Sequence, residues 1–409
     1  MRVNLFTFFG HNMSVFRSFT KATADRLYFR NTGLSLPIDL YFFIRRKVRI
    51  PSFSVWGWML CLVTCLGMSK LAVGQKFDKR AVLAQLHLVN GYWQQKHTPD
   101  VWAFWDQAAY HTGNIELYKL TKRQDYVAYS EAWATHNAWK GAKSDNPRSW
   151  KYSYGETDDY VLFGDWQICF QTYIDLYMLD PKPYKIQRAR EVMEYQMATP
   201  RTDYWWWADG LYMVMPVMTK LYHVTGNRLY LEKLHAYLQY ADSIMYDPQE
   251  SLYYRDAKYV YPKHKTANGK KDFWARGDGW VFAGLAKVIQ DLPTDAPHYA
   301  AYVQRYQELA KAIVACQQPE GYWTRSLLDP DHAPGRETSG TAFFTYGLLW
   351  GINQGLLNDA VYVRAAESGW AYLSGVALQK DGRVGYVQPI GEKAIPGQVV
   401  DAHSTASFG

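Results

Sequence analysis

Residues 208–230, ADGLYMVMPVMTKLYHVTGNRLY, contain the pattern that decides the fold. Ala208-Asp209-Gly210 suits the start of a helix, and a mostly apolar stretch follows it. Thr225-Gly226-Asn227 supplies a C-cap and a tight turn, after which a second, Tyr-rich helix is expected. The stretch therefore predicts a hairpin of one apolar inner helix and one amphipathic outer helix.

Similar openings recur along the chain at Trp105-Asp106, Gly164-Asp165, Ala208-Asp209, Gly277-Asp278, Ser339-Gly340 and Ser407-Phe408-Gly409. Six stacked hairpins of this kind predict an all-α fold, an (α/α)6 barrel. The expected helices cover residues 77–96, 106–121, 123–139, 162–180, 183–199, 208–225, 227–245, 279–292, 297–317, 338–355 and 359–375. The sixth inner helix would open within residues 404–409, so we expect it to be cut off at the C-terminus, leaving one face of the first helix uncovered.

The formal net charge of +7 over 409 residues is concentrated at the N-terminus. Residues 1–74 contain ten Lys or Arg and two acidic residues, which leaves 35 basic and 36 acidic residues from Gln75 onward. The globular part is therefore nearly neutral, and nothing in its composition favours a nucleic-acid partner.

Residues 45–74 have the layout of a secretory signal. Arg45-Arg46-Lys47-Val48-Arg49 precedes an apolar run at 55–68, and Ala72-Val73-Gly74 offers small residues before a cleavage point ahead of Gln75. The run is short for a membrane span. We expect cleavage, export to the periplasm without stable membrane association, and a single barrel domain at 75–409. A signal anchor is the alternative, and residues 1–44 suggest a start codon assigned too early.

Two aromatic clusters lie where loops enter predicted inner helices. Residues 204–207 place three Trp in a row before Asp209, and residues 273–280 place a Trp on each side of Arg276. All inner helices of such a barrel point the same way, so these loops should converge at one mouth. Aromatic rings with a few polar groups are typical of a sugar-binding site. Three consecutive Trp cannot all face inward on a helix, so at least one should line the opening.

Asp165 and Asp209 begin adjacent inner helices and should face each other at this mouth. We interpret Asp106 and Asp278, at similar positions, as helix caps. Neighbouring indoles should raise the pKa of the Asp209 carboxyl, whereas the helix N-terminus should lower it. Two carboxylates whose pKa values are pushed apart are typical of an acid and base pair.

Three segments resemble the motifs of the unsaturated rhamnogalacturonyl hydrolases, glycoside hydrolase family 105, which are related to the unsaturated glucuronyl hydrolases of family 88. The segments are Trp207-Ala208-Asp209-Gly210-Leu211-Tyr212-Met213, Phe273-Trp274-Ala275-Arg276-Gly277-Asp278-Gly279-Trp280 and Glu337-Thr338-Ser339-Gly340-Thr341-Ala342. The resemblance covers residues 77–409. It implies an (α/α)6 barrel that removes a 4,5-unsaturated uronic acid from the non-reducing end of lyase-generated oligosaccharides, such as an unsaturated rhamnogalacturonan disaccharide. In that chemistry an Asp protonates C4 and water adds to C5.

By motif position the resemblance assigns the general acid/base to Asp209 and the second essential carboxylate to Asp165. Arg276 suits the uronate carboxylate or a nearby hydroxyl because its guanidinium is a planar fork. Tyr254 stands where relatives often have a His, which leaves the sugar open. The substrate-binding residues implied are Trp207, Trp206, Trp274, Arg276, Trp280, Tyr254, Trp105 and Ser339.

Two other classes of protein remain open from the sequence. One is another helical-barrel sugar enzyme, and the other is a non-catalytic sugar-binding barrel, which would not need both carboxylates. We expect no metal and no cofactor, because no Asp, Glu or His pair has ligand spacing on one helix face. Cys169 and Cys316 are expected to be buried apolar residues. The expected partner is an oligosaccharide substrate, and the sequence leaves the oligomeric state unknown.

Overall fold

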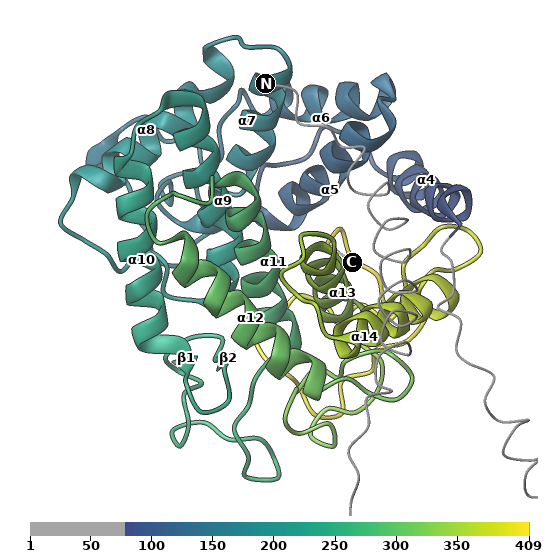
Figure 1. Cartoon of the computed structure of the whole chain (residues 1–409). Helices are drawn as coiled ribbons and strands as arrows, with labels where there is room; N and C mark the ends of the chain where they lie inside the picture. The colour runs from purple at the N-terminus through teal and green to yellow at the C-terminus, as the bar shows by residue number, and fades with distance from the viewer. Residues whose placement is uncertain (1–77, 409) are drawn as a thin grey trace, which may run out of the picture. The chain divides into compact units, whose positions relative to one another are not determined.

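The computed structural model describes residues 78–408 and is mostly helical (Figure 1). The predicted leader and its signal segment lie outside these residues. The α-helices are α4 (Lys79–Lys96), α5 (Trp105–Thr121), α6 (Gln124–His136), α7 (Cys169–Leu179), α8 (Tyr184–Ala198), α9 (Ala208–Thr225), α10 (Leu229–Met245), α11 (Ala275–Asp291), α12 (Tyr299–Ala315), α13 (Thr338–Asn353) and α14 (Ala360–Tyr372). The shorter elements are η1 (Pro147–Ser149), η2 (Gly164–Trp166), η3 (Leu373–Ala377) and the antiparallel pair β1 (Tyr246–Asp247) and β2 (Leu252–Tyr253).

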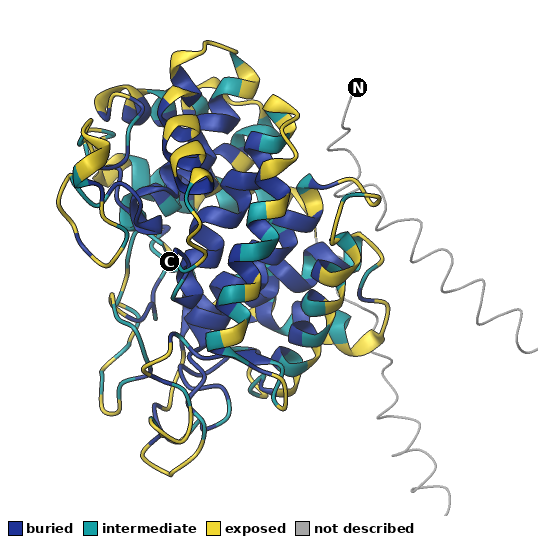
Figure 2. Cartoon of the chain, turned by 90° about the vertical axis from the view of Figure 1, so that its left-hand side faces the viewer, coloured by how far each residue is buried: buried dark blue, intermediate teal, exposed yellow. Residues whose placement is uncertain are grey.

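The helices form two layers. The inner helices α5, α7, α9, α11 and α13 each pack on the next, and each of α6, α8, α10, α12 and α14 packs on the inner helix before it. Burial follows the layers, because every residue of α9 from Ala208 to Leu221 is buried whereas α10 buries only one side (Figure 2). The predicted all-α barrel of inner and outer helices is confirmed.

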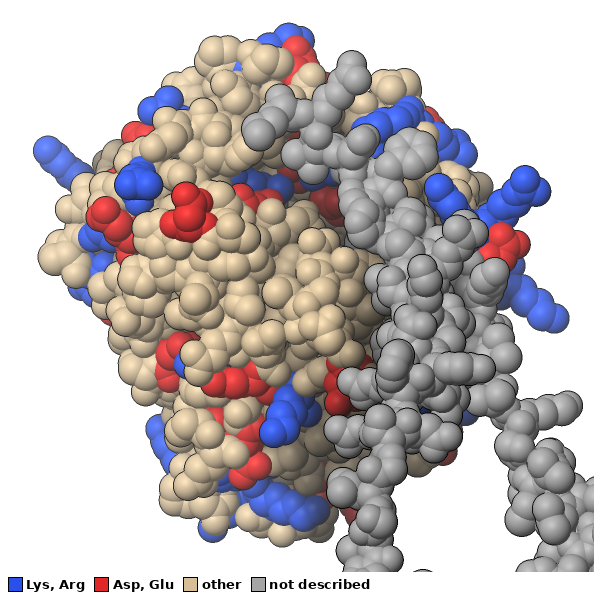
Figure 3. Space-filling view, in the orientation of Figure 1, with Lys and Arg blue, Asp and Glu red and all other residues tan. Residues whose placement is uncertain are grey.

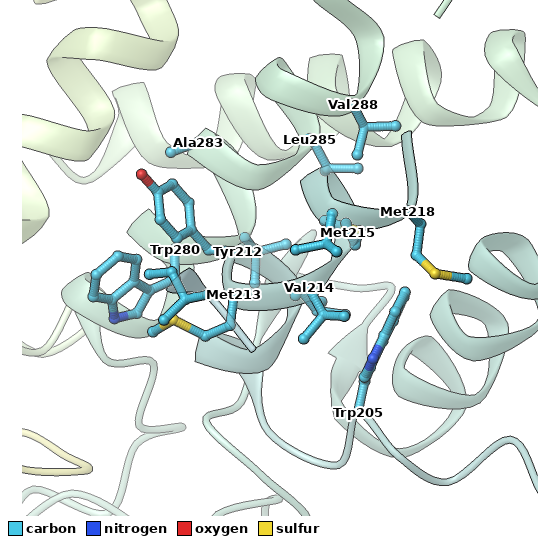
Figure 4. Packing of buried hydrophobic residues seen from close by; sticks show 14 of the residues in the cluster. Trp205, Tyr212, Met213, Val214, Met215, Met218, Trp280, Ala283, Leu285 and Val288 are labelled. Carbon is cyan, nitrogen blue, oxygen red and sulfur yellow. The ribbon is translucent and has the colours of Figure 1, made fainter. Parts of the chain in front are cut away.

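The inner helices approach each other closely where small residues face large ones. A Cβ atom at Gly284 of α11 would lie 3.2 Å from the Tyr212 Cα of α9, a tight contact that the glycine avoids. Apolar side chains of the two helices, including Met215 and Leu285, fill the adjoining space (Figure 4). Cys169 and Cys316 belong to the same buried cluster, as predicted.

Two helix starts differ from the sequence-based expectation by four residues or more. Helix α11 begins at Ala275 rather than at residue 279, because Trp274 has extended backbone and serves as its N-cap. Arg276 and Asp278 are therefore inside the first turn. Helix α7 begins at Cys169 rather than at residue 162, because a separate 3-10 turn forms at Gly164–Trp166. Asp165 lies in that turn.

The last described residues do not start a helix. Residues 378–408 form an irregular segment whose backbone bonds to other parts of the fold, as in the hydrogen bond from the Thr338 amide to the Tyr386 carbonyl at 2.9 Å. Its Phe408 ring packs on Trp105, with ring centroids 4.9 Å apart. Helix α4 buries only Asn90. An irregular segment therefore lies next to the inner helices at the end of the described chain, where the sequence predicts the start of a sixth inner helix.

Charge is mixed over the described surface. Acidic and basic side chains are interspersed on the face shown in Figure 3, around a broad area of other residues. None of the helices in residues 78–408 is both long enough and apolar enough to span a bilayer.

Candidate active site

Asp165 and Asp209 lie close together, although Asp165 is in the 3-10 turn η2 and Asp209 is in helix α9. Both are almost fully buried, with 7% and 8% of their surface exposed. They lie close enough that the charge of Asp209 raises the pKa of Asp165. The structure therefore brings together the two carboxylates that the sequence singled out.

The Trp207 indole fixes the spacing of these two carboxylates. A Cβ atom at Gly164 would lie 3.1 Å from the Trp207 ring, and one at Gly210 would lie 3.1 Å from three atoms of the same ring. The indole is thus wedged between the residue before Asp165 and the residue after Asp209. Trp207 is 1% exposed, so it acts as a buried support for the site.

The two carboxyl groups differ in their electrostatic surroundings. Burial is the largest cause of the raised pKa of Asp165, which lies well above its usual range, and the charge of Asp209 adds to it. Burial also raises the pKa of Asp209, to about 6, but the cations Arg255 and Arg276 oppose that rise. The pKa of Asp165 is thus raised more strongly than that of Asp209, and two carboxyl groups whose pKa values are pushed apart are typical of an acid and base pair.

Arg255 is a site residue that the sequence interpretation missed. Its Nε atom lies 3.4 Å from Asp209 Oδ2, and its Nη1 atom reaches both Asp256 at 2.6 Å and Glu392 at 3.2 Å. It also lies over the Trp206 ring, 5.8 Å from the centroid. No helical or strand pattern marks a loop residue such as Arg255, so only the folded chain reveals its proximity to Asp209.

Polar atoms without partners mark the position for a ligand. The buried side-chain atoms of residues 78–408 that have no hydrogen-bond partner include Asp106 Oδ1 and Asp209 Oδ1. Buried polar groups are normally satisfied, so these oxygens are groups that a substrate or water would bind. Asp106 was interpreted as a cap, but Phe104 is the N-cap of α5, and burial raises the Asp106 pKa. The charge of Asp106 also raises the pKa of Asp165.

The three consecutive Trp residues have different environments. Trp205 and Trp207 are each 1% exposed, whereas Trp206 is only half-buried. Trp206 stacks nearly parallel to Phe163, with an interplanar angle of 13°. Trp206 is therefore the one of the three that is not fully buried, and its position at the opening stays a prediction.

Trp280 and Trp105 line the interior of the helical layer. Trp280 is buried and its ring lies 4.8 Å from Tyr212 and 4.3 Å from Phe343. Trp105, from α5, meets Trp280 edge-on at 6.3 Å. The two indoles therefore join the first inner helix to the fourth through aromatic contacts.

Arg276, Ser339 and Trp274 hold the C-terminal segment. Arg276 is 1% exposed and donates to the carbonyls of Gln388 at 2.6 Å and Pro389 at 2.7 Å, and to Ser339 Oγ at 3.3 Å. The Trp274 indole donates to Gln388 Oε1 at 2.8 Å. The structure thus corrects the expected direct contact between Arg276 and the substrate, because the guanidinium nitrogens already donate to main-chain carbonyls.

Tyr254 is a packing residue in this structure, which corrects its assignment to substrate binding. Its hydroxyl donates to Asp247 Oδ2 at 2.9 Å and its ring stacks on Phe273 at 4.4 Å. Successive side chains of extended backbone point in opposite directions, so Arg255 faces the carboxylates when Tyr254 faces the core. In this segment the residue next to the carboxylates is therefore Arg255, and not the predicted Tyr254.

A helical barrel with paired buried carboxylates beside aromatic side chains defines a carbohydrate-active enzyme. The sequence model of Glycosyl Hydrolase Family 88 matches residues 79–409. The chain belongs to this family and is a glycoside hydrolase, which confirms the family relationship inferred from the three motifs. Within residues 78–408 no three His, Cys, Asp or Glu side chains are placed to hold a metal ion.

Individual relatives match this chain over most of its length. An unsaturated 3S-rhamnoglycuronyl hydrolase of Formosa agariphila is 30% identical over 365 residues, which is 86% of this chain and 93% of the relative. A solved structure described as a glycosyl hydrolase family 88 protein from Bacteroides vulgatus is 62% identical, with a TM-score of 0.79 over 80% of this chain and 94% of the other. Another, described as a polysaccharide lyase, is 69% identical, with a TM-score of 0.78 over 80% and 92%.

Proposed function

We propose that the protein removes a C4–C5 unsaturated uronic acid from the non-reducing end of oligosaccharides that polysaccharide lyases release. The observation that carries this proposal is the pair of buried carboxyl groups Asp165 and Asp209, with Asp209 Oδ1 left without a hydrogen-bond partner and with the two pKa values raised to different extents. Hydration of an enol ether needs a proton donor and an acceptor for the proton of water. The activity of the Formosa agariphila relative supports the same substrate class.

The pKa directions favour an assignment of roles opposite to the one drawn from the motifs. Asp165, with its pKa well above the usual range, is the better proton donor to C4. Asp209, ionised near Arg255, accepts a proton from the water whose oxygen bonds to C5. The resulting hemiketal opens and releases the remaining sugar with its hydroxyl. One proton is thus delivered and one is taken up in each turnover.

The leaving sugar sets the specificity of such an enzyme. Elimination across C4 and C5 removes the stereocentre that distinguishes glucuronic from galacturonic acid, so the unsaturated residue is the same from either source. We propose rhamnose as the sugar bonded to the unsaturated uronate, in a disaccharide or a longer fragment derived from rhamnogalacturonan or from a rhamnoglycuronan. The name of the Formosa agariphila relative supports a rhamnose-containing substrate.

Ultraviolet absorbance of the unsaturated uronate tests this function. The purified protein should reduce the absorbance of unsaturated disaccharides, and it should release one rhamnose for each unsaturated uronate that is consumed. Asp165→Asn and Asp209→Asn should each lower kcat by about 10² to 10⁴. Asp145→Asn, a change at a surface carboxylate that is 69% exposed, is the matched control.

The second candidate function is that of a lyase, because a 69% identical protein is described as one. A lyase creates the C4–C5 double bond and raises the absorbance of an intact polysaccharide, whereas the proposed hydrolase lowers the absorbance of the fragments. The sign of the change therefore separates the two functions. Growth of absorbance on uncleaved polysaccharide, with none lost on disaccharides, would refute the proposal.

We further propose that the enzyme is exported, because residues 45–74 have the layout of a signal segment. N-terminal sequencing of protein from its native host should find Gln75 first. An N-terminus that retains residues 1–44 would contradict cleavage at this position.

A further inference from the structure

Two strongly exposed aromatic side chains lie on the loops that precede the site carboxylates Asp106 and Asp165. Tyr154 is 59% exposed and Trp102 is 41% exposed, although most aromatic residues of the described chain are buried. Tyr154 lies on the loop before η2, which carries Asp165. Trp102 lies on the loop before α5, which carries Asp106. Each exposed ring is therefore on the segment that leads directly to a site carboxylate.

The buried Trp166 links the two loops that carry these rings. Trp166 meets Trp102 edge-on, with centroids 5.7 Å apart, and its indole donates to the Gly155 carbonyl, next to Tyr154, at 3.1 Å. Phe104 packs on Trp166 at 4.7 Å. Isolated exposed aromatics are common on proteins and need no explanation, but two exposed rings on linked loops next to a site indicate a binding surface.

Both loops are held in place before any ligand binds. The Tyr154 hydroxyl donates to Glu156 Oε1 at 2.7 Å, and the Leu162 amide donates to the Lys151 carbonyl at 3.0 Å, closing the loop. The Trp102 carbonyl accepts from the Trp133 indole at 3.2 Å. Exposed rings that are already fixed lose little conformational freedom on binding a ligand.

Contacts with the carboxylates connect this surface to the chemistry. The charge of Glu156 helps to raise the pKa of Asp165, and hydrogen bonding from the Trp102 indole lowers the pKa of Asp106. The Tyr154 ring lies 5.7 Å from Phe163, which itself stacks on Trp206. Aromatic side chains therefore extend from the half-buried Trp206 outward to the exposed Tyr154.

We propose that Trp102 and Tyr154 form a stacking subsite for the first two sugars of the leaving oligosaccharide. This inference rests on the proposed function, in which the unsaturated end enters the buried carboxylates and only the leaving part reaches the exposed rings. Sugar rings place their C–H faces on aromatic rings, as exposed Trp and Tyr allow. The subsite makes substrates longer than a disaccharide the preferred ones.

The test compares an unsaturated tetrasaccharide with the methyl glycoside of the unsaturated uronic acid, which has no leaving sugar to stack. Tyr154→Ala should lower the ratio of kcat/KM for the tetrasaccharide to that for the methyl glycoside by about 5- to 10-fold, mainly through KM. Tyr154→Phe keeps the ring and should restore the ratio. Tyr184→Ala is the matched control, because Tyr184 is 49% exposed on the outer helix α8.

Calorimetry on Asp165→Asn with the tetrasaccharide separates this inference from the proposed function. Adding Tyr154→Ala to that variant should weaken tetrasaccharide binding by the same factor, whether or not the wild type turns the sugar over. The wild type could consume no unsaturated uronide while Tyr154→Ala still weakens tetrasaccharide binding. In that case the proposed function fails and the subsite does not. An unchanged kcat/KM ratio and unchanged binding in Tyr154→Ala would overturn the subsite.

Discussion

The Arg255→Met substitution should shift the acidic limb of the pH profile of kcat/KM to higher pH. The Arg255 Nε atom lies 3.4 Å from Asp209 Oδ2, and its charge lowers the pKa of Asp209 from the value that burial alone would give. Two unit charges at this separation interact by roughly 1 to 5 kcal/mol for effective dielectric constants between about 80 and 20. Because Asp256 and Glu392 share the same guanidinium, we take the lower part of this range.

One pKa unit corresponds to about 1.4 kcal/mol, so the pKa of Asp209 should rise by about one to two units in Arg255→Met. Asp209 then becomes protonated at higher pH and can no longer accept a proton from water. In the wild type kcat/KM should fall as the pH drops through about 6, the pKa of Asp209. In the variant the same fall should begin at or above neutrality.

Initial rates of absorbance loss on an unsaturated disaccharide, measured across the pH range, give both profiles. Lys258→Met is the matched control, because Lys258 pairs with Glu392 at 3.3 Å and with Asp256 at 3.8 Å but is 61% exposed and has no contact with Asp209. Arg255→Lys keeps a charge and should stay near the wild-type limb. If Arg255→Met is folded and its acidic limb coincides with that of the wild type, the assigned role of Arg255 is refuted.

Three further predictions concern the support of the site and the stability of the fold. Gly164→Ala should lower the free energy of unfolding by about 1 to 3 kcal/mol in urea titrations, because the new Cβ would lie 3.0 Å from Val214 and 3.1 Å from Trp207. The same variant should lose activity, and full stability would contradict the packing argument. Arg276→Lys cannot donate to both carbonyls of the C-terminal segment, so KM should rise by roughly 10-fold and Tm should fall, and unchanged kinetics would show that the segment does not shape the site. Burial lowers the pKa of His111 in the folded protein, so as the pH falls this side chain is protonated first in the unfolded chain. The free energy of unfolding should therefore decrease as the pH falls below about 6.5. His111→Gln should flatten that decline in unfolding titrations, and an equal slope in both proteins would exclude His111 as its source.

Local patterns were sufficient for the helices and for the paired carboxylates. The start at Ala208-Asp209 and the stop at Thr225-Gly226 depend on capping and turn preferences within a few residues, so α9 has the predicted bounds of 208–225. Asp165 and Asp209 could be paired in advance because inner helices that point the same way bring their N-terminal ends together. Helix α11 was misplaced by four residues, since the extended Trp274 depends on a bridge to Ser326.

The chemistry of the site depended on contacts between distant segments, which no local pattern encodes. Gln388, 112 residues after Arg276 in the chain, supplies the carbonyl that occupies the Arg276 fork, and Arg255 reaches Asp209 from a loop of another repeat. The pKa of a carboxyl group depends on its burial and on every charge around it, so the strongly raised pKa of Asp165 follows from the assembled structure. The sequence by itself determined which helices form and which carboxylates meet, because those follow from local backbone preferences. Only the tertiary structure decided which cation faces Asp209 and which carboxyl group has the more strongly raised pKa, because irregular loops take their paths from long-range contacts.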